Sequence, residues 1–380
     1  MERTFRIGPI RPPSEATSLL LQVTNGCTWN KCKFCRLYKD TKFRAYSADS
    51  IKADIDNMVY HADKVRKYRN SDGSWDIDGI NAEISMAGED EKQCIYMVAQ
   101  WLINGGRNVF LQDGNTTALS SGRLSDVLVY LKKAFPHIQR ITSYGRAENL
   151  ARVSAEEFAE LKAAGLDRIH SGFESGSDEV LEKINKGVTS EQEITAGKNI
   201  KAGGIELSVY FMPGVGGREL TVENAEGTAR VVNEVNPDFL RIRTAAVKPG
   251  TELYEDFISG TFTLCSDYEK LLEIRRVIEL AKDVDTRIAS DHIINLLQGV
   301  RGKMREDREK MLAVIDDYLG SPEEEKRMFQ AARRLAMVVS PGEMRRLPEY
   351  ETQRLKDMVS SVTDPYEWEI EMNRLISRYI

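Results

Sequence analysis

Short runs of β-forming residues alternate with longer amphipathic segments through the first two thirds of the chain. Six such runs are predicted as strands: Leu19–Val23, Asn108–Gln112, Arg140–Tyr144, Asp167–Phe173, Glu206–Phe211 and Phe239–Arg243. A repeated strand–helix–strand pattern predicts parallel strands joined by crossover helices. Six strands are too few for a closed eight-stranded barrel. We therefore expect an α/β fold built on a curved, partly open barrel.

The segments between these strands carry recognisable helix boundaries. Ser154 followed by Glu157 is a capping box, and Gly165 is placed to end that helix. Thr189 followed by Gln192 opens another helix, which should end near residues 203–204. These signals support the assignment of crossover helices.

The alternation ends near Gly260, and helical patterns follow. Apolar residues recur at three- and four-residue spacing in four segments: Tyr268–Asp283, Asp291–Leu297, Arg308–Tyr318 and Glu323–Met337. Three prolines in the last forty or so residues predict short helices there. A polar insertion, residues 63–93, separates the first helix from the helix that leads into the second strand. We expect a core domain over 1–260 and a helical region over 261–380.

The composition is that of a soluble enzyme. The 380 residues are 41% hydrophobic and 29% charged, and the longest apolar run near the start is Leu19-Leu20-Leu21, too short for a signal peptide or a membrane span. We expect a cytoplasmic protein with no membrane partner. The formal net charge of −6 argues against a broad nucleic-acid surface, although a local basic patch remains compatible with it.

Three of the five cysteines are clustered. Cys27, Cys32 and Cys35 lie in the run Cys-Thr-Trp-Asn-Lys-Cys-Lys-Phe-Cys, and no further cysteine or histidine is close in sequence. A structural zinc site requires four protein ligands. A cubane cluster held by three thiolates leaves one iron open. The spacing by itself leaves an open cluster, a zinc site and a simple electron-transfer site as alternatives. The isolated Cys94 and Cys265 are expected to be buried thiols.

The cysteine run resembles the cluster motif of the radical S-adenosylmethionine (radical SAM) superfamily, with four residues in the first gap and Phe34 before the last cysteine. The segment from His170 to Thr189, with Phe-Glu-Ser-Gly-Ser at residues 173–177, resembles the subgroup of oxygen-independent coproporphyrinogen oxidase, the Elongator catalytic subunit and the tRNA methylthiotransferases. Met212-Pro-Gly and Lys248-Pro-Gly-Thr-Glu-Leu-Tyr254 are typical of that subgroup. Together these motifs span roughly residues 18 to 260.

The resemblance implies a partial (β/α)6 barrel as the core domain and a 4Fe–4S cluster ligated by Cys27, Cys32 and Cys35. It also implies S-adenosylmethionine (SAM) as the second cofactor and a low-potential electron donor of the flavodoxin or ferredoxin type. Reductive cleavage of SAM would then give a 5′-deoxyadenosyl radical. Phe34 could pack on the adenine; its alternative is a core aromatic under the loop.

Two positions depart from the family pattern. A Gly-Gly-Glu sequence often follows the second strand and holds the methionine amino group, whereas this chain has Gln112-Asp113-Gly114-Asn115 there. We expect these four residues to contact the cofactor. Related chains carry an acidic residue on the fifth strand where this one has Leu207, next to Ser208, which puts ribose recognition on that strand in doubt.

Strand parity selects the side chains that face the barrel lumen. Neighbouring residues on a strand point to opposite faces, and apolar residues such as Ile141, Ile169 and Val209 should face the outer helices. This leaves a polar set for the lumen: Thr142, Tyr144, Arg146, His170, Glu174, Ser208, Tyr210, Arg241 and Arg243. We predict catalytic roles for Tyr144, His170, Tyr210 and Arg241. Cofactor contacts are predicted for Arg146, Glu174, Ser208 and Arg243. For His170 a hydrogen-bonded core role is an equal alternative, and His292 is expected at a helix start.

Two inward arginines need anionic partners, because burying an unpaired charge is costly. The SAM carboxylate and an acidic substrate are candidates, and internal pairing, for example with Glu174, is the alternative. The favoured function is a radical SAM enzyme acting on a small anionic metabolite. An RNA-modifying radical SAM enzyme is the second hypothesis, and a cluster- or zinc-binding module without catalysis is the third. Absence of a recognisable RNA-binding domain and the acidic charge balance disfavour the second.

Overall fold

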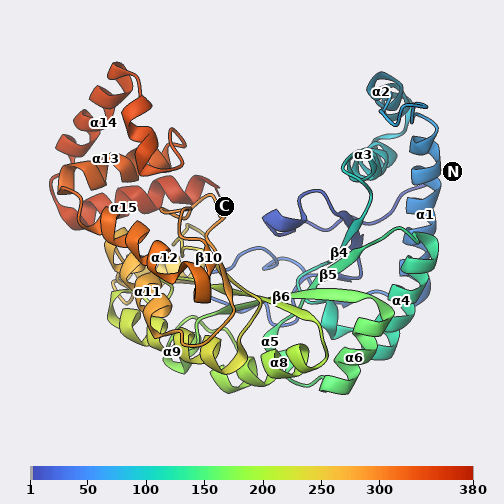
Figure 1. The fold of residues 1–380 in the computed structure, drawn as a ribbon, viewed down its shortest axis with the longest axis horizontal. Coiled ribbons are helices and arrows are strands. Elements are labelled where there is room, and N and C mark those ends of the chain that lie inside the picture. The colour runs from blue at the N-terminus through green and yellow to red at the C-terminus, as the bar shows by residue number, and fades with distance from the viewer. Residues whose placement is uncertain (1–2, 380) are drawn as a thin grey trace. The chain divides into compact units, whose positions relative to one another are not determined.

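The computed structural model describes residues 3–379, which form two compact units interleaved along the chain (Figure 1). Unit 1 comprises residues 3–30, 40–171 and 199–207, and unit 2 comprises residues 31–39, 172–198 and 208–379. This division reflects compactness alone, so the boundary expected near residue 260 stays a prediction. The two units are described separately below.

The sheet of unit 1 consists of parallel strands in the order β1 (Leu19–Gln22), β4 (Asn108–Gln112), β5 (Arg140–Tyr144) and β6 (Leu166–Glu174), of which β6 continues into unit 2. The first four predicted strands are therefore confirmed to within about a residue at each end. The interior strand β4 is buried along most of its length, which explains why it reads as a continuous apolar run. A two-stranded ribbon, β2 (Thr24–Asn25) with β3 (Arg44–Ala45), flanks the start of the cysteine run.

Helices connect the strands of unit 1 in chain order. In Figure 1 the helices α1 (Ala48–Arg66), α4 (Ser121–Ala134) and α6 (Ala155–Ala164) follow one another, and each contacts the next. The capping box of α6 is formed as expected, with Ser154 and Glu157 bonded reciprocally, and Gly165 ends the helix in the left-handed region. The 63–93 insertion contains α2 (Ile77–Met86) and leads into α3 (Glu89–Ile103). Short elements complete the unit: η1 (Pro13–Glu15), η2 (Thr116–Ala118) and α5 (Ala147–Leu150).

Unit 2 continues the α/β pattern with β7 (Glu206–Phe211, which begins in unit 1), β8 (Phe239–Ile242) and β9 (Arg287–Ala289), which are parallel, and β10 (Gly302–Lys303), which is antiparallel to β9. The fifth and sixth predicted strands are confirmed. The prediction that only helices follow residue 260 is wrong, because β9 and β10 lie in that region. These strands have three and two residues, too few to show a period of two.

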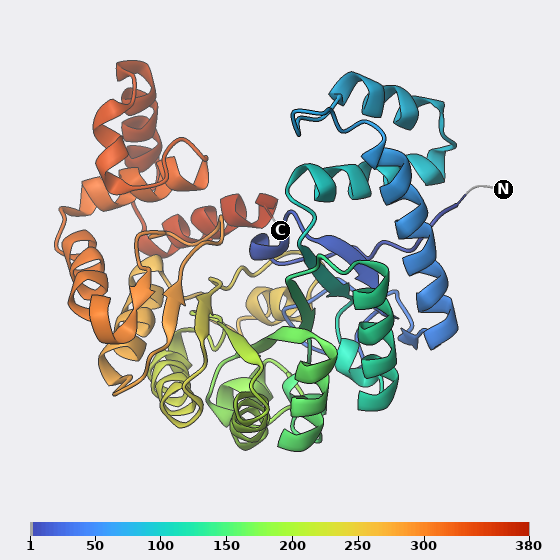
Figure 2. The same ribbon diagram turned by 45° about the vertical axis from the view of Figure 1, so that its right-hand side comes forward.

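The helices of unit 2 include α7 (Asp178–Lys183), α8 (Ser190–Ala202, shared with unit 1), η3 (Arg218–Leu220), α9 (Thr221–Val235), α10 (Glu252–Ile258) and α11 (Asp267–Leu280). The chain ends in α12 (Met304–Leu319), α13 (Glu323–Arg334), η4 (Pro341–Arg346), α14 (Glu349–Ser361), α15 (Pro365–Ile376) and η5 (Ser377–Tyr379). Figure 2 shows this last group in orange and red. None of the helices within residues 3–379 is long and apolar enough to cross a bilayer.

The helix expected over Asp291–Leu297 is not formed, and the placement of His292 at a helix start is therefore wrong. Asn295 explains the irregular backbone. Its side chain accepts from the Thr244 amide at 3.0 Å and donates to the Ile242 carbonyl at 2.7 Å. These bonds tie the segment to the end of β8, while Ile294, Leu296 and Leu297 are still buried. Tertiary hydrogen bonds thus override a helical apolar spacing.

Candidate active site

The loop that carries Cys32 and Cys35 is held by backbone bonds within unit 2. The Lys33 amide donates to the Ile184 carbonyl at 2.9 Å, and the Leu253 amide donates to the Lys33 carbonyl at 2.9 Å. The Asn185 side chain donates to the Lys31 carbonyl at 3.1 Å. Ile184 and Asn185 belong to the segment from His170 to Thr189, and Leu253 belongs to the motif from Lys248 to Tyr254. Motifs far apart in sequence therefore position the cysteine loop.

The clustered cysteines differ in exposure from one another and from the two isolated cysteines. Cys27, in unit 1, and Cys35, in unit 2, are half-buried, Cys32 is buried, and all five cysteines are free. Burial raises the pKa of Cys94 and of Cys265, the latter strongly, so both are protonated, inert thiols. Within residues 3–379 no group of three or more His, Cys, Asp or Glu side chains is preassembled for a metal ion. The ligand set therefore stays a prediction from the family resemblance of the cysteine run.

Lys248 lies near Cys35 and has two further positive charges close to it. Burial and the nearby Arg36 and Arg243 lower the pKa of Lys248, while Cys35 acts in the opposite direction. Burial, followed by the charge of Arg243, lowers the pKa of His292 to about 4. Neutral His292 thus adds no further positive charge at pH 7, and the charges of Arg36, Arg243 and Lys248 favour anionic ligands in this region.

We expect Arg243→Gln to raise the pKa of His292 by roughly one unit, because removing a neighbouring like charge favours the protonated ring. The pKa should stay below its usual value, since burial persists. The ring signals of the four histidines can be titrated by NMR. Arg287→Gln, at an exposed position of β9, is the matched control and should leave His292 unchanged. An unchanged pKa in the Arg243 variant would contradict the placement of this charge.

Phe34 packs against two apolar clusters of unit 2, one that includes Ile184 and Met212 and one that includes Val247 and Leu253. The Lys186 ammonium lies 5.6 Å from its ring centroid. These contacts match the alternative reading of Phe34 as a core aromatic under the loop. Its contact with adenine stays a prediction.

Glu174, at the end of β6, adopts the left-handed conformation with φ of 68°, which is uncommon for a residue other than glycine. Its carboxylate pairs with the Lys186 ammonium at 2.9 Å, and both side chains are 10% exposed. Among the residues that the structure describes, Glu174 therefore pairs with a lysine and not with an arginine. The nearby Glu193 is fully buried, and neither of its oxygens has a hydrogen-bond partner among the described residues. Burial raises the pKa of Glu193 well above its usual value, which favours the neutral form of this carboxyl.

The loop after β4 is a hydrogen-bonded network within unit 1. Asn115 donates to Asn149 at 2.6 Å and to Thr28 at 3.0 Å, and it accepts from the Arg146 amide at 3.2 Å. Thr28 directly follows Cys27, so Asn115 links this loop to the start of the cysteine run.

The other residues of this loop differ in accessibility. Gln112 uses its amide on the backbone of Gly8 and Ile10, at 2.6–3.1 Å, which favours a structural role for its side chain. Asp113 is fully buried, and Gly114 is half-buried. Contact of these four residues with SAM stays a prediction.

Tyr144 and His170 share one face of the unit 1 sheet, as strand parity predicts. Their ring centroids are 6.0 Å apart, and Phe110 of β4 lies 5.0 Å from Tyr144. Arg146 lies over the Trp29 ring at 5.9 Å. Sequence reasoning missed Glu15, which is fully buried and lies 3.7 Å from His170. Burial would raise the pKa of Glu15, but the interaction with His170, the hydrogen bond from Ser18 and the charge of Arg140 outweigh it and lower the pKa.

In unit 2, Arg241 and Ser208 share a face, again as parity predicts, and the guanidinium donates to the Ser208 hydroxyl at 3.0 Å. Arg241 also pairs with Asp291 at 2.7 Å, although the Asp291 side chain is 47% exposed. Internal pairing, the alternative considered for the arginines, thus holds for Arg241. Arg243 is exposed and Tyr210 is half-buried. The roles of these four residues stay predictions.

Comparisons with known proteins agree with this arrangement. Residues 82–230 match the sequence profile of the radical SAM superfamily. An uncharacterized methyltransferase of Pyrococcus horikoshii is 28% identical over 171 residues, 45% of this chain and 36% of that protein. A 4′-phospho-dehydrooxetanocin synthase of Priestia megaterium is 25% identical over 278 residues, which cover 70% of this chain and 30% of that protein. A tRNA uridine(34) acetyltransferase of Methanocaldococcus infernus is 28% identical over 132 residues, which cover 34% of this chain and 24% of that protein.

The aligned regions thus span about a third or less of the length of these relatives. The profile match includes the loop after β4, all of β6 with Glu174, and β7 with Ser208. The α/β fold with mostly parallel strands and helices at its C-terminal end agrees with that match. The implied cofactors are a 4Fe–4S cluster and SAM. Residues 82–230 of the chain belong to the radical SAM superfamily.

Proposed function

We propose that the chain is a radical SAM enzyme that acts on a small anionic substrate. When bound, the cluster and SAM supply a 5′-deoxyadenosyl radical after one-electron reduction. Cys27, Cys32 and Cys35 would hold the cluster, and soft thiolate donors suit iron. The backbone bonds from Ile184 and Leu253 keep the loop of Cys32 and Cys35 in place.

The observation that carries this proposal is the positive charge beside Cys35. The charges of Arg36 and Arg243 lower the pKa of Lys248, which also interacts with Cys35. The charge of Arg243 lowers the pKa of His292 as well. Such a field stabilises an anionic ligand, either the carboxylate of SAM or an acidic substrate. Arg241 adds a buried guanidinium whose carboxylate partner, Asp291, is 47% exposed and could be exchanged for a ligand. The Priestia megaterium relative is named for a phosphorylated compound, 4′-phospho-dehydrooxetanocin, which is consistent with an anionic small molecule.

Reconstitution under anaerobic conditions tests the proposal. Protein loaded with iron and sulfide should contain about four irons, on the cluster stoichiometry of the family. With SAM and dithionite it should form 5′-deoxyadenosine and methionine, measured by liquid chromatography and mass spectrometry. Omission of the reductant is the control. A loaded protein that leaves SAM intact would favour the third hypothesis, a binding module without catalysis.

An RNA substrate is the second candidate, because one relative is a tRNA uridine(34) acetyltransferase. The net charge of −6 argues against a large phosphate-binding surface. A filter-binding titration with bulk tRNA at two salt concentrations separates the candidates. An RNA enzyme with six or so phosphate contacts should lose roughly a thousandfold in affinity between low and physiological salt. Weak binding at both concentrations would support the small-molecule substrate.

A further inference from the structure

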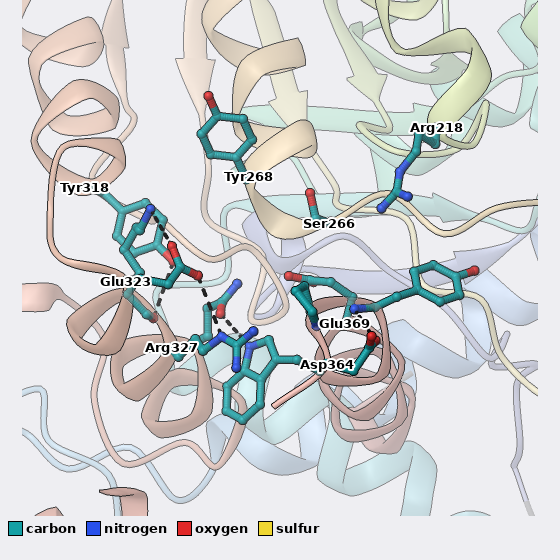
Figure 3. A pocket seen from close by; sticks show the side chains of 13 residues that line it. Arg218, Ser266, Tyr268, Tyr318, Glu323, Arg327, Asp364 and Glu369 are labelled. Carbon is teal, nitrogen blue, oxygen red and sulfur yellow. Dashed lines mark hydrogen bonds and ion pairs between the residues drawn. The ribbon is translucent and has the colours of Figure 1, made fainter. Parts of the chain in front are cut away.

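A pocket of about 470 Å³ lies among the C-terminal helices of unit 2 (Figure 3). The start of α11, the end of α12, one face of α13 and the start of α15 line it, together with Arg218. None of the candidate active-site residues described above contributes to the lining. Its volume lies in the range of small-molecule sites. The pocket is therefore a separate candidate binding site.

Two poorly exposed cations share one exposed carboxylate in this pocket. The side chains of Lys326 and Arg327 on α13 are 17% and 12% exposed, whereas that of Glu323 is 70% exposed. One oxygen of the Glu323 carboxylate lies 2.9 Å from the Lys326 ammonium, and the other lies 3.6 Å from Arg327 Nε. Figure 3 labels Glu323 and Arg327 in the lining. Removing two cations from water requires strong anionic compensation. A carboxylate that remains largely in solvent gives little net stabilisation, so a ligand anion can replace it.

The other two acidic side chains of the lining, Asp364 and Glu369, repel a bound anion less than two free carboxylates would. Asp364 caps α15 and accepts from the Tyr366 and Glu367 amides at 2.8 Å, so the helix N-terminus offsets its charge. Glu369 is bonded to the Asp267 amide at 3.1 Å. Burial and the neighbouring Asp267 raise the pKa of Glu369 to about 7, so it is partly protonated near neutral pH. The lining thus favours negative charge beside α13.

Aromatic rings supply part of the remaining surface. Tyr268, Tyr366 and Trp368 line the pocket, and each has a cation over its ring, at 5.9 Å for Lys326, 5.5 Å for Arg218 and 5.3 Å for Arg327. Tyr268 is 49% exposed, so part of its ring is free for contact. Such rings favour a flat, apolar ligand body next to the charged group.

We propose that this pocket binds a small planar organic anion, such as an aromatic carboxylate, whose charged group replaces the Glu323 carboxylate between Lys326 and Arg327. The proposal does not depend on the reaction catalysed at the cysteine loop. It predicts that the Glu323 carboxylate competes with the ligand. Removing that carboxylate should therefore strengthen binding, whereas a cation-binding pocket would lose affinity from the same change.

The probe for the test is 2-naphthoate, with 2-naphthylmethylamine as the cation of similar shape. Binding to the full chain can be followed by calorimetry and by the indole N–H signal of Trp368, which donates to Gln330 at 2.7 Å. Glu323→Gln should tighten naphthoate binding about three- to fivefold, the usual range for an exposed ion pair. Lys326→Gln should weaken it roughly tenfold. Glu324→Gln is the matched control, since Glu324 is exposed on the same turn and does not line the pocket.

Glu323 is largely exposed, so its variant should fold and keep the test decisive even if the Lys326 variant is unstable. Tighter naphthoate binding in Glu323→Gln, with an unchanged Glu324→Gln, supports the proposal. Preferential binding of the amine, weaker naphthoate binding in Glu323→Gln, or no Trp368 shift with either probe would each overturn it.

Discussion

Replacing Cys35 by alanine should abolish the iron–sulfur absorbance of reconstituted protein and reduce SAM cleavage to background. Two thiolates cannot hold a cubane that three hold with one iron open. Cys27→Ala and Cys32→Ala should behave in the same way, because no fourth cysteine or histidine is near in sequence. Cys35 is half-buried, so the loss should come without loss of the fold. Iron content and the visible spectrum measure the cluster, and thermal unfolding of the metal-free variant measures the fold.

Cys94→Ala and Cys265→Ala are the matched controls and should retain the cluster. Cys94 is bonded to the Phe5 backbone, and both thiols are 2% exposed. A variant of Cys27, Cys32 or Cys35 that retains four irons, or a Cys265 variant that loses them, would show that the ligands are assigned incorrectly.

Glu273→Gln should remove a large part of the loss of stability that occurs as the pH rises from 4.5 to about 8. Glu273, on α11, is 2% exposed and accepts from the Gly214 amide at 2.9 Å and from Asn224 at 2.6 Å. Burial raises the pKa of this carboxyl from 4.5 to about 8, although these two hydrogen bonds act in the opposite direction. The folded chain therefore keeps a proton that the unfolded chain has released. The protonated Glu273 carboxyl therefore makes its whole contribution to the free energy of unfolding below pH 4.5. That contribution is lost as the pH rises from 4.5 through 8.

The expected loss is on the order of a few kcal/mol, since each pKa unit corresponds to about 1.4 kcal/mol. Urea unfolding at several pH values between about 5 and 9 measures it. The glutamine side chain of the variant carries no titrating proton, so the variant should exceed the native protein in stability at the alkaline end of this range and lose that advantage toward the acidic end. Part of the pH dependence should remain, because burial also raises the pKa values of Glu193 and Glu369.

Glu223→Gln, at an exposed position of α9, makes the same charge change and should leave the pH dependence unaltered. Identical pH slopes for the native protein and the Glu273 variant would show that Glu273 is not a neutral carboxyl in the folded chain.

Local patterns in the sequence predicted the secondary structure wherever the elements were long enough to show them. All six predicted strands are formed, as are the capping box at Ser154 and the helix opening at Thr189. Strand parity also placed Tyr144 with His170, and Ser208 with Arg241, on shared faces. These features depend on side-chain alternation and on bonds between residues close in the chain.

The ionic environment of the site could not be predicted in this way. Glu15, Glu193 and Glu273 resemble surface residues in the sequence, yet each is buried. Their burial is set by elements distant along the chain. Lys186, near Glu174, and Asp291, near Arg241, also became identifiable as partners only from the structure.

The sequence by itself therefore determined the α/β class, the superfamily resemblance and the cysteine run, because each is written in residues that are adjacent or regularly spaced. The tertiary structure decided how Ile184 and Leu253 hold the cysteine loop, which carboxyls are neutral, and where Lys326 and Arg327 meet three aromatic rings. Those properties depend on distances between remote segments and on removal from water. Neither quantity is encoded in local spacing.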